Sequence, residues 1–138
     1  MADLPTSRCK RYGMLKINWS VWDNNSTVSW DFNANSVRVE MKMPPLGVAN
    51  LKSKSLIAIV GRFNEFGSSN LLLYSYEGIL QRAFKAPSLG KCSQFTSVSE
   101  SNGIVSVGIG FDTDSEWEEK SAQFNIIDGT LTNYHRSY

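Results

Sequence analysis

The stretch that decides the fold is Val28-Ser-Trp-Asp-Phe-Asn-Ala-Asn-Ser-Val-Arg-Val-Glu-Met-Lys-Met43. Apolar and polar residues alternate over residues 28–32, and they alternate again over residues 37–43. A period of two is typical of a strand that buries one face and exposes the other, as antiparallel sheets do. The polar segment Asn33-Ala-Asn-Ser36 between the two parts has the composition of a turn. The stretch therefore predicts an antiparallel hairpin.

Other segments of the chain carry the same signal. Residues 15–21 alternate in the same way, and Glu77-Gly78, Asn102-Gly103 and Asp128-Gly129 each separate two apolar runs, which is a strong hairpin pattern. The continuous apolar runs 56–60 and 104–111 are typical of central strands that are covered on both faces. The remaining predicted strands are residues 71–76, 79–84, 124–127 and 130–134.

The one candidate helix spans residues 115–121, where Ser115 and Glu118 have the spacing of a capping box. We interpret it as a single turn within a long hairpin loop.

Together these segments predict about ten short strands and essentially no helix, which is an all-β, antiparallel fold. We expect a single domain over residues 1–138, built as two facing sheets in a sandwich-like arrangement, with residues 1–13 as an N-terminal arm that is free to move. The predicted core consists of apolar residues on the buried side of the alternating strands: Ile17, Trp19, Trp30, Phe32, Val39, Ile57, Ile59, Leu73, Val105, Val107, Phe124 and Ile126.

An internal repeat points to an alternative architecture. The segment Lys42-Met-Pro-Pro-Leu-Gly47 recurs 43 residues later as Lys85-Ala-Pro-Ser-Leu-Gly90. Residues 71–78 and 122–129 resemble the outer hairpin of a propeller blade. About two and a half such units do not close a ring of the usual size. Propeller-blade-like repeats in a single chain are therefore the alternative to two facing sheets.

Composition excludes several classes of protein. The chain has 138 residues, of which 41% are hydrophobic and 20% charged, with a net charge of +1. These values exclude a disordered tail, a collagen-like repeat and a general nucleic-acid binder. Because no apolar run is long enough to cross a membrane and no signal peptide is evident, we expect a cytoplasmic protein. Cys9 and Cys92 are then expected to be free thiols.

The sequence offers little for catalysis. His135 is the sole histidine and lies in an alternating segment, so we interpret it as a surface residue rather than a general base. No phosphate-binding loop or nucleophile elbow is present, and Gly108-Ile-Gly110 lies within a strand, where glycines allow close packing of another strand or side chain. We predict that the chain is not an enzyme and that it needs no cofactor and no metal.

Ionisable residues concentrate in the segment Asp112-Thr-Asp-Ser-Glu-Trp-Glu-Glu119. A calcium loop is disfavoured because Trp117 stands where such a loop requires glycine. Residues 1–99 hold 12 basic and 6 acidic residues, net +6, whereas residues 100–138 hold 2 basic and 7 acidic residues, net −5. We therefore predict a surface that binds a basic partner, with a tryptophan as its anchor. Its residues are Asp112, Asp114, Glu116, Trp117, Glu118 and Glu119.

The opposite charge gathers near the N-terminus, in Arg8, Lys10, Arg11 and Lys16. Nucleic-acid binding is not expected from this group, because Trp19 and Trp30 alternate with polar residues as core side chains do and are poor candidates for base stacking.

A small all-β chain with an acidic, tryptophan-bearing segment and no catalytic motif resembles the small cytoplasmic immunity proteins of bacterial toxin systems, including those of contact-dependent growth inhibition. The resemblance implies a stoichiometric inhibitor that binds a protein toxin, in particular a basic nuclease, without doing chemistry. The alternative is a carbohydrate-binding, lectin-like module that uses Trp22, Tyr74, Tyr76 and Tyr134 as sugar platforms.

Overall fold

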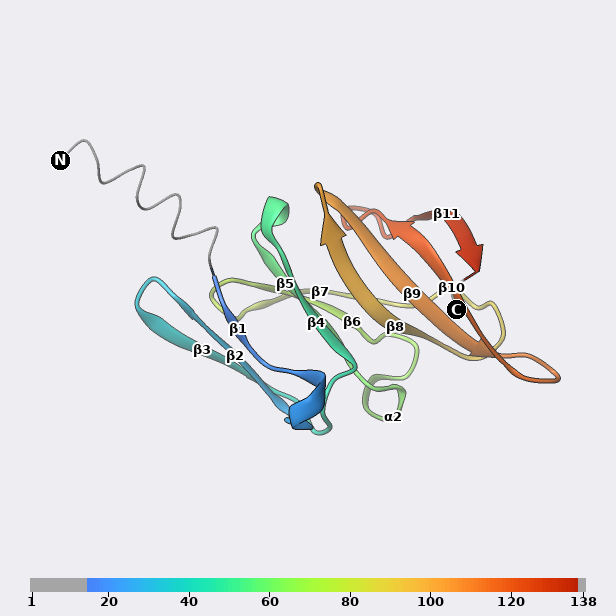
Figure 1. Ribbon diagram of the computed structural model, residues 1–138, viewed down its shortest axis with the longest axis horizontal. Helices are drawn as coiled ribbons and strands as arrows, with labels where there is room; N and C mark the ends of the chain where they lie inside the picture. Colours follow the sequence, from blue (N-terminus) through green and yellow to red (C-terminus); the bar gives the residue numbers. More distant parts are fainter. Residues whose placement is uncertain (1–14, 137–138) are drawn as a thin grey trace.

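The computed structural model describes residues 15–136, which form eleven strands in three antiparallel sheets (Figure 1). Sheet A consists of β1 (Ile17–Asn18), β2 (Thr27–Phe32) and β3 (Asn35–Glu40). Sheet B consists of β4 (Gly47–Leu51), β5 (Leu56–Val60), β6 (Leu71–Ser75) and β7 (Leu80–Phe84). Sheet C consists of β8 (Lys91–Ser101), β9 (Ile104–Asp112), β10 (Trp117–Phe124) and β11 (Leu131–Arg136).

Helical structure is confined to three short turns of the described chain: η1 (Val21–Asp23), η2 (Lys52–Lys54) and α2 (Phe63–Phe66). None of the helices in residues 15–136 has the length and apolarity needed to cross a bilayer. The all-β class is therefore confirmed. The predicted arm over residues 1–13, with Arg8, Cys9, Lys10 and Arg11, lies outside the described residues.

Each sheet is a meander in which consecutive strands are neighbours. The repeated segments 42–47 and 85–90 connect sheet A to sheet B and sheet B to sheet C. The hairpins that resemble a propeller blade's outer hairpin are the last two strands of sheets B and C. The structural repeat is thus a connecting segment followed by a four-stranded meander. Face-to-face packing of sheets is confirmed, but the structure has three sheets rather than the two expected.

Sheet B lies between the other two sheets (Figure 1). Along β5, Ala58 and Val60 belong to a core cluster shared with sheet C, whereas Ile57 and Ile59 belong to a second cluster shared with sheet A. Residues 57–60 are all completely buried. Side chains of a strand point alternately to opposite faces, so a run without polar residues has to be covered twice. The prediction of a doubly covered strand over residues 56–60 is confirmed.

The predicted core is largely correct. Eight of its twelve residues are buried: Trp30, Val39, Ile57, Ile59, Leu73, Val105, Val107 and Phe124. The other four are partly buried and pack against the edges of the two clusters: Ile17, Trp19, Phe32 and Ile126.

Asn70 joins sheet B to sheet C, and its side chain is completely buried just before β6. The amide nitrogen donates hydrogen bonds of 2.8 Å to the carbonyl oxygens of both Gly61 and Phe95, and the amide oxygen accepts one of 2.9 Å from the backbone N–H of Phe95. The side chain therefore satisfies both backbone groups of Phe95 as a neighbouring strand would. A buried amide with all of these bonds in place fixes where β8 starts to pack on sheet B.

Sheets A and B are joined by a second polar contact. The indole nitrogen of Trp30 donates a buried hydrogen bond of 2.8 Å to the carbonyl oxygen of Tyr76, and the Tyr76 hydroxyl donates one of 2.7 Å to Oδ1 of Asn50. Burial, opposed by the hydrogen bond to Asn50, raises the pKa of Tyr76. The neutral hydroxyl is therefore the form that this contact requires.

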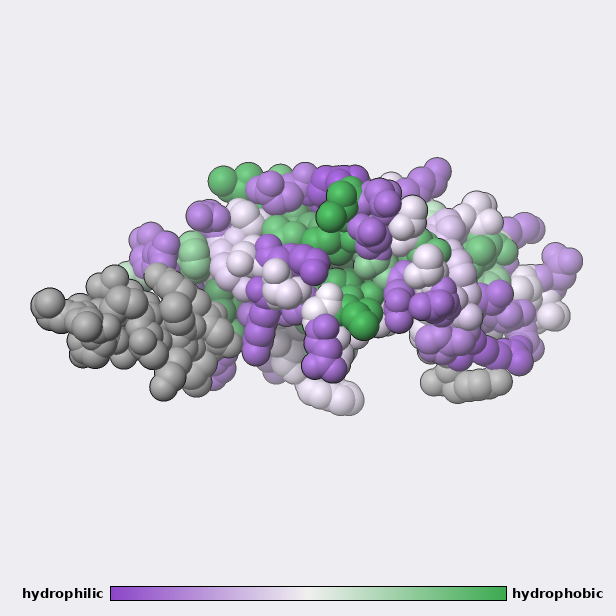
Figure 2. Space-filling model, turned by 90° about the horizontal axis from the view of Figure 1, so that it is seen from above, coloured by the Kyte–Doolittle hydropathy of each residue, from purple (hydrophilic) through white to green (hydrophobic). Residues whose placement is uncertain are grey.

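The outward faces of the two terminal sheets are polar. In sheet A this face carries exposed Asp31, Ser36, Arg38 and Glu40, and in sheet C it carries exposed Ser97, Ser99, Gln123 and Thr132. Seen from above, hydrophobic residues gather in the middle of the molecule and hydrophilic residues dominate the end that carries sheet C (Figure 2). The apolar residues are thus concentrated at the two interfaces with sheet B.

Replacing Asn70 by alanine tests the contact between sheets B and C. The Asn70→Ala variant removes three hydrogen bonds and leaves both backbone groups of Phe95 buried without partners, so we expect the free energy of unfolding to fall by about 2–4 kcal/mol. Urea denaturation measures this loss. The matched control is Asn64→Ala on the exposed side of α2, for which a change within about 0.5 kcal/mol is expected. Equal midpoints for the two variants would contradict the role given to Asn70.

Three tryptophans in and beside sheet A differ in burial, so truncating each of them tests how far burial determines its contribution to stability. Trp30 is 1% exposed and Trp22 is 90% exposed. Truncation of Trp30 to alanine is expected to cost about 3–5 kcal/mol, whereas the same change at Trp22 should stay within about 0.5 kcal/mol. Trp19→Ala should fall between them, because Trp19 is half-buried. Thermal unfolding monitored by circular dichroism gives the order, and a Trp22 variant as unstable as the Trp30 variant would be incompatible with this packing.

Candidate partner-binding site

The acidic segment forms a tight hairpin between β9 and β10. Four residues, 113–116, connect the strands, and Thr113 organises them. Its backbone N–H and its hydroxyl both donate 2.8 Å hydrogen bonds to the carbonyl oxygen of Glu116, while its Oγ1 accepts one of 3.1 Å from the Glu116 N–H. The loop is therefore short and internally bonded, and it extends beyond the body of sheet C (Figure 1).

The expected helical turn over residues 115–121 is wrong. Strand β10 begins at Trp117 and pairs with β9 through eight consecutive residues, from Trp117 opposite Asp112 to Phe124 opposite Val105. This pairing buries Ala122 and Phe124 in the core. The gain from a full strand ladder outweighs the local preference of a capping box, which contributes at most a few hydrogen bonds.

Strand alternation divides the six predicted site residues. Trp117 and Glu119 lie on the outward face of sheet C, on the same side as Asp112, which is directly opposite Trp117. Asp114 and Glu116 are exposed in the loop. Glu118 is opposite Phe111 and therefore points to the other face. The structure thus brings Asp112, Trp117 and Glu119 to one face, leaves Asp114 and Glu116 in the adjoining loop, and places Glu118 on the opposite face.

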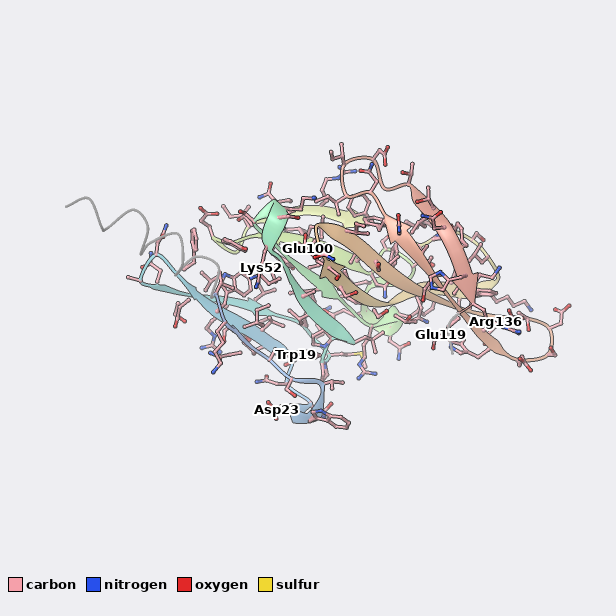
Figure 3. The ribbon with its side chains drawn as sticks, turned by 45° about the horizontal axis from the view of Figure 1, so that its top comes forward. Trp19, Asp23, Lys52, Glu100, Glu119 and Arg136 are labelled. Atoms are coloured by element: carbon pink, nitrogen blue, oxygen red, sulfur yellow. The ribbon has the colours of Figure 1, made fainter. Side chains whose placement is uncertain are left out.

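Glu118 belongs to a different group of side chains at the edge of sheet C. With Lys120, Tyr134, His135 and Arg136 it lines a shallow cavity of about 310 Å³. Figure 3 labels Arg136 on β11, the strand next to the β10 residue Glu119. His135 is exposed, and its Nδ1 lies 3.2 Å from the carbonyl oxygen of Asn133.

Trp117 lies against the sheet rather than standing out from it. A Cβ placed on Gly110 would overlap the indole carbon Cζ2, so the ring occupies the space that the glycine leaves open. The interpretation of Gly108-Ile-Gly110 as a site of close packing is confirmed for Gly110, and the packing group is this indole. With 42% of its surface exposed, the side chain keeps one side open to solvent.

Glu119 is held beside the indole. Its Oε2 accepts a hydrogen bond of 3.2 Å from the indole Nε1–H of Trp117, and its Oε1 accepts one of 3.5 Å from the hydroxyl of Thr96 on β8. Thr96 and Thr113 carry no motif that would mark them in the sequence. The role of Thr96 follows from its place on β8 beside Glu119, and the role of Thr113 follows from its hydrogen bonds within the loop.

The carboxylates of the hairpin have no cationic partner among residues 15–136. The one ion pair in this part of the chain joins Arg38 and Glu40 of sheet A, with 4.0 Å between nitrogen and oxygen. Nor does the described chain bring three histidine, cysteine, aspartate or glutamate side chains together in a group able to hold a metal ion. Within residues 15–136 the hairpin carboxylates therefore form no ion pair, and the nearest cation in register is Lys91 of β8, opposite Asp112.

The opposite end of sheet C is different in character. A cavity of about 350 Å³ lies between the β8–β9 and β10–β11 turns, and its wall includes Ile104, Phe124 and Ile127 beside Lys54. Successive turns of a meander lie at alternate ends, so this cavity, lined by both apolar and polar residues, and the acidic hairpin are separated by the length of the strands. A basic partner is suited to the hairpin and not to this cavity.

The aromatic residues considered as sugar platforms are dispersed. Trp22 is exposed in η1, where its backbone N–H donates a 3.2 Å hydrogen bond to Oγ of Ser20; Figure 3 labels Asp23, the last residue of this turn, and Trp19, which precedes the turn. Tyr74 is half-buried and Tyr76 is buried between sheets A and B, whereas Tyr134 is exposed on β11. These four side chains do not form equivalent sites on the repeats. Cys92 is an exposed free thiol in β8.

Comparison with known proteins gives no relative for this chain: its sequence matches no family model and no curated protein, and its structure matches no solved structure.

The packing of the indole on Gly110 is testable by filling the space beneath it. Gly110→Ala forces the ring off the sheet, so we expect a loss of about 1–3 kcal/mol in stability and a shift of the Trp117 indole N–H resonance as its bond to Glu119 breaks. Gly47→Ala is the control, because a Cβ there has no neighbour within 4 Å. An unchanged indole resonance in Gly110→Ala would place the ring elsewhere.

Proposed function

We propose that this chain is a protein-binding inhibitor of the immunity type, which acts in the cytoplasm and neutralises a basic bacterial toxin, in particular a nuclease, by stoichiometric binding. The observation that carries the proposal is the β9–β10 hairpin. It presents exposed Asp112, Asp114 and Glu116, with Trp117 beside them, on a short loop bonded by Thr113.

Electrostatics supports this assignment. Carboxylates crowded into one hairpin repel one another in the free protein, and the repulsion is relieved when a cationic surface approaches. Nucleases bind a phosphate backbone and therefore carry basic clefts. An acidic hairpin that extends from the sheet matches such a cleft in charge, and its field accelerates encounter with a basic partner.

Rigidity of the hairpin also supports binding. Three hydrogen bonds between Thr113 and Glu116 hold the loop, and the β9–β10 ladder continues directly into the core of sheet C. A binding element that is already ordered loses little conformational entropy when it docks. High affinity is therefore attainable from a small contact area.

Charge reversal at the hairpin tip tests the proposal. The variant Asp114→Lys/Glu116→Lys should slow association with the basic nuclease domain of the proposed toxin partner by about tenfold or more at low salt, and the difference should shrink at high salt. Surface plasmon resonance at two salt concentrations measures the rates, and growth of cells producing the toxin domain reports protection.

The matched control is Asp31→Lys/Glu77→Lys, which changes the net charge by the same amount at exposed positions away from the hairpin. If both double variants associate equally fast, the hairpin is not the contact surface. If the wild-type chain neither binds nor protects against the toxin domain, the immunity function is refuted.

A further inference from the structure

We infer that Trp117, Asp112 and Glu119 form a seat for one arginine side chain of the partner. The inference deepens the proposed function, on which it rests for the identity of the partner, by naming the chemical group that the hairpin receives. It also assigns Trp117 a different role from the one expected of an interface tryptophan, which is to enter a pocket on the other protein.

The position of the indole excludes insertion into a pocket. The ring fills the gap above Gly110, and its Nε1–H is bonded to Glu119 3.2 Å away. A ring held against the sheet in this way offers a binding surface to a partner and does not project into the partner. The fully protruding tryptophan of the chain is Trp22, at 90% exposure against 42% for Trp117. Trp117 is therefore placed to receive a side chain.

The electron-rich face of an indole attracts cations, and tryptophan is the strongest of the aromatic residues in this respect. Its neighbours add to the attraction. Asp112 stands directly opposite Trp117 in the strand register, a pairing that places the two Cβ atoms about 4.5–5.5 Å apart. Glu119 lies on the same face, opposite Gly110, and accepts the hydrogen bond of the indole N–H. A cation above the indole is thus within reach of two carboxylates.

Glu119 retains capacity for a further donor. It accepts one hydrogen bond at each oxygen, from Trp117 and Thr96, and an ionised carboxylate offers about four acceptor positions. These two bonds also fix the orientation of the carboxylate. The seat therefore has its acceptors in place before a ligand arrives.

Guanidinium fits this arrangement better than ammonium or a neutral sugar. Its plane stacks on the indole while its N–H groups extend sideways to the carboxylates, and it is more weakly hydrated than ammonium. A neutral sugar gains no charge–charge attraction from Asp112 and Glu119. The cation nearest in register on this face is Lys91 of β8, which lies opposite Asp112 and on the far side of it from Trp117.

The test uses the full chain labelled with ¹⁵N and three probes: N-acetyl-arginine methylamide, its neutral citrulline isostere, and maltotriose. We expect the arginine probe to bind in the millimolar range and to shift the Trp117 indole N–H together with the amides of Gly110 and Asp112. The citrulline isostere should bind at least about fivefold more weakly, because it lacks the charge.

Matched variants separate the seat from general surface charge. Trp117→Leu should abolish the shifts at Gly110 and Asp112, Glu119→Gln should weaken arginine binding about threefold or more, and Trp22→Leu should leave it unchanged. Lys91→Ala should bind the arginine probe at least as well as the wild type. Each variant is first checked for the wild-type amide spectrum away from sheet C.

Three outcomes would overturn the inference: equal binding of the citrulline isostere, tighter binding of maltotriose, or arginine shifts that survive Trp117→Leu. None of these measurements uses the toxin. If charge reversal at Asp114 and Glu116 slows toxin association but the arginine probe does not bind, the proposed function is supported and the arginine seat is refuted. If the arginine probe binds as expected but the chain does not bind the toxin, the arginine seat is supported and the immunity function is refuted.

Discussion

Sheet B is covered on both faces along its central strands β5 and β6, and the rest of the structure follows from that constraint. Its two central strands carry apolar side chains at consecutive positions, with Ile57 and Ile59 facing sheet A and Ala58 and Val60 facing sheet C. Burial of apolar area is the dominant favourable term in folding, so sheet B is stable only when both neighbours are present. Sheets A and C each depend on sheet B in turn, because each has a single apolar face.

Much of this was predictable from the sequence, for a physical reason. An alternating or continuous apolar pattern reports whether a side chain is buried, which is why most strands and eight of the twelve predicted core residues are correct. It does not report which sheet lies opposite. Residues 37–41 alternate in the same way whether two sheets or three are present, so the number of sheets could not be predicted from this pattern. The repeat at Lys42 and Lys85 was the signal that marked the boundaries between sheets.

The polar contacts between sheets were not predictable. Asn70 looks like an ordinary loop residue in the sequence, and its role depends on the position of Phe95, which is 25 residues away along the chain. The same limit applies to the candidate site. Charge counting identified its acidic residues, but the assignment of Glu118 to the opposite face required the register of β10 on β9. The place of the Trp117 indole required that register too, because Gly110 is its diagonal neighbour.

The polar outward faces of sheets A and C have a consequence for how such a chain can grow. Proteins built from stacked repeats need terminal units whose outer surface tolerates water. Asp31 and Arg38 at one end, and the serine-rich surface with Ser97 and Ser99 at the other, have that property. A duplication that added a further meander would bury these groups without partners, at a cost of several kcal/mol. Within residues 15–136, sheets A and C therefore act as the caps of sheet B.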